Sequence, residues 1–180
     1  DTSSIVREHE IRENKSGLIN IIGGKWTTYR KMSEQLVDYV YKTQNKKKQK
    51  CKTKKLKLVG SKNLDENYVS NKVDANTNEY LLSQYGDKVK SVLSASKNIE
   101  YLTNGEPYTN VEVIYTIKEE FVQKPMDFLV RRCNVALINK NVSIEILDKV
   151  VQIMKDELKW DDEKANKEKE EALYVLNTFI

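Results

Sequence analysis

The stretch LINIIGGKWTTYR, residues 18–30, changes character halfway along and decides how the first part of the chain folds. Its opening residues, 18–22, are mostly β-branched and apolar, which is typical of a buried strand. Gly23 and Gly24 then permit a tight turn, because glycine has no side chain to restrict the backbone. Beyond the turn, apolar side chains recur at helical spacing. They are Tyr29, Met32, Leu36 and Val40. The stretch therefore predicts a strand, a glycine turn and a helix.

The residues that precede this stretch favour a second strand. Residues 4–11 have strand-like content, although their apolar alternation is imperfect. Residues 12–17 are polar and include the turn-forming Gly17, so they are expected to form a hairpin loop between the two strands.

The glycine turn also carries the residues most suited to binding a ligand. Gly23 and Gly24 allow a ligand to approach the backbone, and the amides at a helix start favour anionic or electron-rich atoms. Lys25 adds a positive charge, and Thr27 and Thr28 add hydroxyl groups. Such a turn suits a phosphate, a pyrophosphate or the carbonyl edge of a flavin. The spacing matches neither of the glycine-rich nucleotide-binding motifs, so a plain strand-to-helix turn with a surface lysine fits it equally well.

Residues 46–57, which we call the lysine segment, hold eight lysines and no acidic residue. The whole chain has a formal net charge of +4, so the rest of it carries −4. The basic character is therefore local. Residues 43–63 lack periodicity and are expected to be a basic linker or an insertion.

The remainder of the chain predicts helices. Only six glycines and two prolines occur in 180 residues, which disfavours a turn-dense β fold. Ser143 is expected to cap the clearest helix, and Pro125 to occupy the first position of another. The expected helices cover residues 64–73, 79–85, 87–96 and 111–122, a segment from 125, residues 143–158, and a last segment that starts at 161.

Several motifs in this order resemble FAD-dependent glycerol-3-phosphate dehydrogenases of the mitochondrial type. The glycine-glycine-lysine and threonine-threonine-tyrosine-arginine pattern of residues 23–30 is similar to the end of that family's flavin domain, and Trp26 matches its mitochondrial branch. Other landmarks resemble the family's helical C-terminal domain. They are residues 84–88 (QYGDK), 112–115 (EVIY) and 127–132 (DFLVRR), Leu137, Asn139 and residues 157–162 (ELKWDD).

The resemblance implies a mainly α fold, in which a helical C-terminal domain follows a short strand-turn-helix remnant of the FAD-binding domain. Residues 1–42 would be the C-terminal edge of the FAD-binding and substrate domain. Residues 43–63 would be the basic linker or insertion, and residues 64–180 the helical domain.

The implied activity is oxidation of sn-glycerol 3-phosphate to dihydroxyacetone phosphate, with electrons passed to a quinone. FAD is the implied cofactor, but the main dinucleotide-binding fold is missing, so we expect this chain alone to bind no FAD and to be inactive. The implied partners are the N-terminal FAD-binding portion of the same protein, glycerol 3-phosphate, quinone and a membrane surface, without nucleic acid. A homodimer is compatible with the pattern. The implied location is the mitochondrial inner membrane, as a peripheral protein.

The resemblance also assigns binding residues. Arg7 and Lys25 would bind the substrate, because a dianionic phosphate requires cationic partners. Gly23, Gly24, Trp26 and Thr27 would lie against the flavin. No catalytic residue and no metal ligand is assigned, and His9, the single histidine, is not taken as a general base, since no motif gives it that role.

Two other functional classes remain open from the residues alone. The lysine segment and the ten tyrosines would suit a basic nucleic-acid-binding module, but the rest of the chain is acidic and has no arginine-rich or stacking motif. The helices would suit an interaction module that docks on a partner, although such a module has no need of a glycine-lysine turn. Retention on heparin or DNA with and without residues 46–57 separates the first class from the others.

Overall fold

A computed structural model describes residues 8–179 of the chain. The chain divides into two compact units, Asp1–Lys57 and Leu58–Ile180, which we call unit 1 and unit 2. Each unit is described separately.

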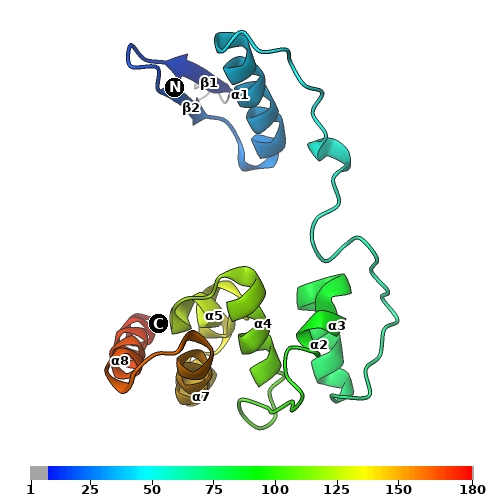
Figure 1. Ribbon diagram of the computed structural model, residues 1–180, viewed down its shortest axis with the longest axis vertical. Coiled ribbons are helices and arrows are strands. Elements are labelled where there is room, and N and C mark those ends of the chain that lie inside the picture. The colour runs from blue at the N-terminus through cyan, green and yellow to red at the C-terminus, as the bar shows by residue number, and fades with distance from the viewer. Residues whose placement is uncertain (1–7, 180) are drawn as a thin grey trace, which may run out of the picture. The chain divides into compact units, whose positions relative to one another are not determined.

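Unit 1 consists of a β-hairpin and one long helix. Strands β1 (His9–Glu13) and β2 (Ile19–Gly23) are antiparallel, with His9 opposite Gly23. The side chain of Asn14 shapes the loop between them by accepting hydrogen bonds from two backbone N–H groups. Helix α1 (Tyr29–Thr43) lies beside the hairpin (Figure 1), and Tyr39 on α1 donates a hydrogen bond to Glu13 at 3.2 Å.

The side chains of unit 1 share little protected space. No residue from 8 to 57 is buried, and several large apolar side chains are largely exposed. They include Trp26, Tyr29, Leu18 and Ile22, at 91%, 66%, 59% and 56%. The hairpin and the single helix of unit 1 thus leave these apolar side chains uncovered.

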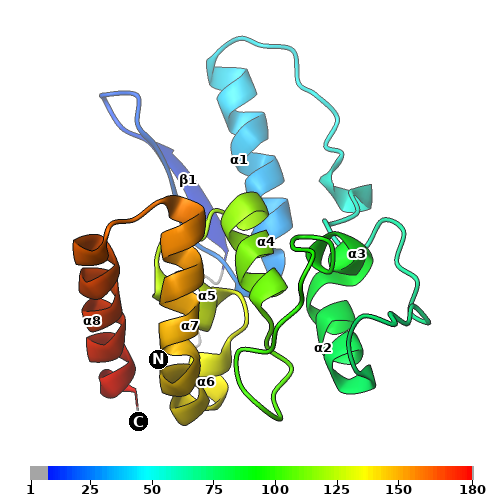
Figure 2. The same ribbon diagram turned by 60° about the horizontal axis from the view of Figure 1, so that its bottom comes forward.

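Unit 2 is a bundle of helices. Figure 2 shows α8, α7 and α4 side by side, with α2 and α3 beyond α4. The helices are α2 (Ala75–Tyr85), α3 (Val89–Val92), α4 (Asn110–Glu120), α5 (Pro125–Arg131), α6 (Val135–Ile138), α7 (Lys140–Leu158) and α8 (Asp162–Thr178).

Helix α4 is the centre of unit 2. Its residues 111–117 are all buried, because it has neighbours on opposite sides. Val113 and Ile117 belong to the apolar cluster shared with α5 to α8. Val111 and Tyr115 belong to a second cluster, shared with α2 and α3. A helix buried on all sides needs apolar residues around its whole circumference, and the sequence VEVIYTI largely provides them.

The predicted mainly α fold with a short strand-turn-helix segment is confirmed, but three local predictions are wrong. Residues 64–73 form turns in place of a helix, because Asp65 accepts a hydrogen bond from the Asn67 N–H, a local contact that competes with a helix. The helix expected over residues 87–96 is short. It consists of the 3-10 turn η4 (Gly86–Lys88) followed by α3, and the Asp87 carboxylate accepts the N–H of Asn63 instead of capping.

The N-terminal cap of α7 is the third difference. Asn139 and not Ser143 caps this helix, by accepting the N–H of Val142 at 3.3 Å. Ser143 lies inside the first turn, where its hydroxyl donates to the carbonyl of Asn139.

A buried carboxyl group joins α2 to α4. Glu112 is fully buried, and one of its oxygens, Oε1, accepts hydrogen bonds from the hydroxyls of Tyr80 at 2.8 Å and Tyr85 at 2.9 Å. The other oxygen, Oε2, has no hydrogen-bond partner. Burial disfavours the charged form and raises the pKa of Glu112 to about 7, although the two tyrosine hydroxyls act in the opposite direction.

This raised pKa predicts a specific dependence of stability on pH. The folded state keeps the Glu112 proton more tightly than the unfolded state does, whose carboxyl titrates near 4.5. Its contribution to the free energy of unfolding is therefore complete below pH 4.5 and falls as the pH rises to 7, by roughly 3 kcal/mol. Glu112→Gln removes the titration, while its amide oxygen can still accept the tyrosine hydrogen bonds. Urea unfolding of the 180-residue chain measures this effect. Between pH 4.5 and pH 7, the free energy of unfolding of wild type should fall by roughly 3 kcal/mol relative to that of the variant. Parallel stability curves would show that Glu112 does not titrate there.

Candidate functional site

The candidate site is the turn that connects β2 to α1. Strand β2 ends at Gly23, after which Gly24 and Lys25 lead into the 3-10 turn η2 (Trp26–Thr28) and then α1. Gly23 and Gly24 have φ values of +78° and +88°, in the region that side chains other than glycine rarely adopt. The two glycines thus have a backbone conformation that reverses the chain within two residues.

The glycines also permit close packing inside unit 1. A Cβ atom on Gly24 would lie 2.5 Å from Sδ of Met32 and 3.3 Å from Cβ of His9. A Cβ atom on Gly23 would lie 2.9 Å from the carbonyl oxygen of Glu8. Gly23 therefore lets the backbone at Glu8 lie close to the end of β2, and Gly24 lets Met32 of α1 lie close to the hairpin.

Thr28 holds the backbone of Lys25. Its Oγ1 accepts the Lys25 N–H at 3.3 Å and donates to the Lys25 carbonyl at 2.9 Å. The Thr28 N–H also donates to that carbonyl, at 2.9 Å. The Lys25 backbone is thereby fixed while its side chain is exposed.

The outer surface of the turn has an aromatic ring, a hydroxyl group and a positive charge. Trp26 is 91% exposed, and its ring centroid lies 6.5 Å from that of Tyr29. Thr27 is exposed beside it. The N–H groups of Trp26 and Thr27 open the 3-10 turn, so they have no acceptor within it. This combination suits a flat ligand that has acceptor atoms and an anionic group nearby.

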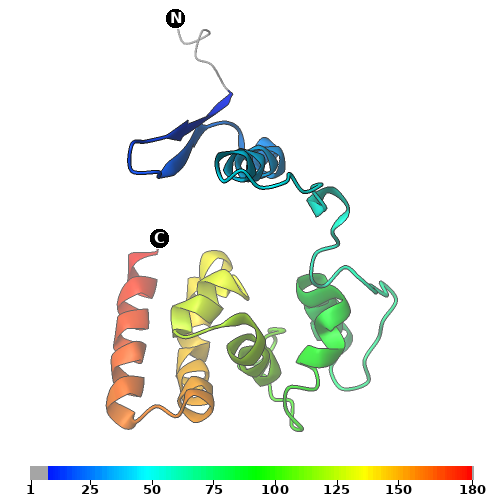
Figure 3. The ribbon, with the colours of Figure 1, turned by 45° about the horizontal axis from the view of Figure 1, so that its top comes forward.

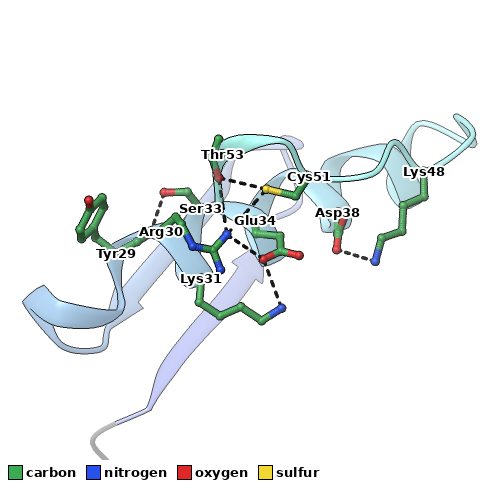
Figure 4. A network of polar contacts seen from close by, with 9 residues as sticks. All are labelled: Tyr29, Arg30, Lys31, Ser33, Glu34, Asp38, Lys48, Cys51 and Thr53. Carbon is green, nitrogen blue, oxygen red and sulfur yellow. Dashed lines mark hydrogen bonds and ion pairs between the residues drawn. The ribbon is translucent and has the colours of Figure 1, made fainter. Parts of the chain in front are cut away.

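Arg30, at the start of α1, is turned toward the lysine segment. Its Nη1 donates to Glu34 at 3.2 Å and Thr53 at 3.5 Å, and lies 3.8 Å from Sγ of Cys51 (Figure 4). The Cys51 sulfur lies 3.1 Å from the Thr53 hydroxyl, and this hydrogen bond lowers the pKa of the Cys51 thiol. Arg30 thus serves unit 1 as a structural tie.

The structure brings together five of the six predicted site residues, Gly23 to Thr27, since they are consecutive in the turn. Arg7 lies outside the described residues. The sequence pattern did not indicate that Thr28 holds the Lys25 backbone or that Met32 packs against Gly24, and it gave His9 no role. The signal for Thr28 was its position three residues after Lys25, the spacing of a capping contact. His9 is opposite Gly23 in the strand register, but a register is not visible before the hairpin is known.

Residues 8–179 contain neither a candidate metal site nor a candidate membrane span. No group of three or more histidine, cysteine, aspartate or glutamate side chains there could hold a metal ion. Within the same range, no helix has both the length and the apolar character needed to cross a membrane.

Comparison with known proteins identifies the family. Residues 51–165 match the model for the C-terminal domain of alpha-glycerophosphate oxidase. The mitochondrial glycerol-3-phosphate dehydrogenase SDP6 of Arabidopsis thaliana is 33% identical over 99% of this chain. This chain belongs to the glycerol-3-phosphate dehydrogenase family. The resemblance seen in the sequence motifs is thereby confirmed.

Other members of the glycerol-3-phosphate dehydrogenase family match equally broadly. The mitochondrial enzyme of Mesocricetus auratus is 35% identical over 98% of the chain, and that of Schizosaccharomyces pombe is 31% identical over 96%. The match covers 32% of the Arabidopsis protein, 26% of the Mesocricetus protein and 32% of the Schizosaccharomyces protein. The chain thus spans about a third or less of the length of these relatives.

A solved structure from the same family has a similar fold. The glycerol-3-phosphate dehydrogenase of Bacillus halodurans, complexed with FAD, superimposes with a TM-score of 0.72 at 26% identity. The similarity covers 93% of this chain and 36% of that protein.

The packing of Gly24 gives a testable prediction. Gly24→Ala should destabilise unit 1 in two ways, by strain at positive φ, about 1–2 kcal/mol, and by displacing the flexible end of the Met32 side chain, about 1 kcal/mol more. Gly17→Ala is the matched control, because Gly17 has a similar φ of +83° and nothing within 4 Å of its added Cβ. Hydrogen exchange of the β2 amides in the complete enzyme measures both effects. Equal losses in the two variants would show that Met32 does not press on Gly24.

Proposed function

We propose that this chain forms part of a FAD-dependent dehydrogenase that oxidises sn-glycerol 3-phosphate to dihydroxyacetone phosphate. The observation that supports this most strongly is the family match over nearly the whole chain, with the glycine-lysine turn inside it. The FAD complex of the Bacillus halodurans relative supports FAD as the cofactor. When bound, the flavin accepts the hydride that leaves the substrate carbon.

The residues of the turn fit both ligands. Lys25 has an exposed ammonium group on a fixed backbone, and a charge of this kind can pair with the substrate phosphate. Trp26 offers an exposed ring, and the N–H groups of Trp26 and Thr27 have no acceptor within the 3-10 turn, so they can donate to a ligand. In this proposal Gly23, Gly24, Trp26 and Thr27 contact the flavin, while Lys25 and Arg7 bind the substrate.

The proposal extends to partners and location. The N-terminal FAD-binding portion of the complete protein would cover the exposed apolar side chains of unit 1, and without that portion the chain would be inactive. Electrons would pass from the flavin to a quinone. The names of the relatives favour a mitochondrial location, and we propose the surface of the inner membrane. A homodimer is compatible with this arrangement.

The role of Lys25 can be tested in the complete enzyme. Lys25→Ala should lower kcat/KM for glycerol 3-phosphate roughly ten- to a hundredfold, through loss of a charge-assisted contact of about 1.5–3 kcal/mol. The melting temperature should change little, because an exposed lysine leaves no cavity. Lys25→Arg should restore activity only in part, since a planar guanidinium does not replace a compact ammonium.

Flavin content decides between the two ligands of the turn. Full flavin content with reduced kcat/KM is the expected result and places Lys25 at the substrate. Loss of flavin together with activity would move Lys25 to the cofactor, and unchanged turnover would contradict both roles. Lys97→Ala is a control for the loss of one exposed lysine far along the chain in unit 2.

A further inference from the structure

The lysine segment, residues 46–57, has a strongly charged surface that the proposed reaction does not use. All eight of its lysines are exposed. It contains no acidic residue that could neutralise them. Figure 3 shows the segment leaving the end of α1 and passing through the short 3-10 turn η3 (Thr53–Lys55).

Contacts with α1 hold the segment at two points. Lys48 forms an ion pair with Asp38 at 2.6 Å, and Thr53 and Cys51 contact Arg30 (Figure 4). Its first residue is also tied back, since the Lys46 N–H donates to the carbonyl of Tyr41 at 2.8 Å. The segment is therefore attached to α1, and its lysines are exposed.

The acidic groups of α1 do not cancel this charge. Asp38 is paired with Lys48, and Glu34 is shared by Arg30 and Lys31. From residue 29 to residue 57 the chain has eleven basic residues and two acidic ones, a net charge of +9. A surface of this charge attracts partners that carry many negative charges.

Apolar side chains accompany the lysines. Leu56 is 66% exposed, and Leu58 and Val59, which follow in the chain, are 75% and 79% exposed. The lysine segment has no arginine and no aromatic residue, the types that read and stack on nucleic acids. Lysines next to exposed aliphatic side chains instead suit a lipid surface, whose headgroups are charged and whose interior is apolar.

We propose that the lysine segment binds the surface of membranes that contain anionic phospholipids. The proposal rests on the membrane location proposed above and specifies the contact, but it does not depend on the reaction. Each lysine near an anionic surface strengthens binding roughly fivefold.

The test uses the 180-residue chain and sedimentation with vesicles of phosphatidylcholine containing 30% phosphatidylglycerol, or of phosphatidylcholine alone. We expect binding to the anionic vesicles only, and loss of this binding at high salt. The triple variant Lys47→Gln, Lys50→Gln, Lys54→Gln should bind roughly a hundredfold more weakly. It leaves the Lys48–Asp38 pair in place.

The matched control removes the same charge from unit 2. Lys97→Gln, Lys159→Gln, Lys167→Gln replaces three exposed lysines, and it should bind nearly as well as wild type. An equal loss in both triple variants would overturn the proposal, because net charge and not the segment would then govern binding. Full binding by the lysine-segment variant would also overturn the proposal. That result would not affect the proposed membrane location or dehydrogenase activity, which separate assays test.

Leu56→Gln separates a membrane from a nucleic acid. Its exposed side chain can enter the apolar boundary of a bilayer, so the variant should bind anionic vesicles about tenfold more weakly. Binding to a DNA duplex, measured by fluorescence anisotropy, should be weak and unchanged by this substitution. In the contrary case, wild type binds the duplex tightly, and the lysine triple variant loses this binding but keeps its binding to vesicles. That result would assign the segment to nucleic acid and contradict the proposal.

Discussion

Unit 1 has too few secondary-structure elements to bury its own apolar side chains, and the accessibility of the glycine turn follows from this. The hairpin and α1 pack closely at one point, where Met32 lies against Gly24 and Gly24 is near His9. Even so, no side chain from residue 8 to residue 57 is buried, and Trp26 is almost fully exposed. The packing fixes the shape of the glycine turn, and the side chains that we propose to bind ligands stay exposed on its outer surface. A site can thus be positioned by so small a unit, and in our proposal the rest of a larger protein completes it.

Unit 2, in contrast to unit 1, buries many of its apolar side chains. Helix α4 is buried along residues 111–117, so the two apolar clusters on either side of it share one helix. Glu112 adds a polar link across this core through Tyr80 and Tyr85. Removing either tyrosine hydroxyl would leave a buried oxygen with fewer partners, which costs more than the hydrogen bond itself contributes. Unit 2 therefore has the interior that unit 1 lacks, so we expect it to be the more stable of the two.

Much of this organisation could be predicted from the sequence. The strand, turn and helix of residues 18–30 have local patterns, and the five neighbouring site residues came together because they are adjacent in the chain. Pro125 begins α5, as its fixed backbone conformation led us to expect. Residues 64–73 were predicted wrongly, because the hydrogen bonds of Asp65 and Asn78 depend on side-chain directions that a hydrophobic pattern does not contain. The burial of Glu112 could not be predicted either, since a charged residue in a helix usually faces solvent. The placement of Arg7 stays a prediction.

We propose that unit 1 is completed by the FAD-binding portion of a larger dehydrogenase. Hydrogen exchange of backbone amides tests it directly, by comparing the 180-residue chain with the complete enzyme. In the chain alone, the amides that pair β1 with β2 should exchange much faster than those of α4 and α7, because few contacts oppose local opening. In the complete enzyme they should be protected nearly as well as α4. Protection of the hairpin in the 180-residue chain equal to that of α4 would contradict the claim, since unit 1 would then be stable without a partner.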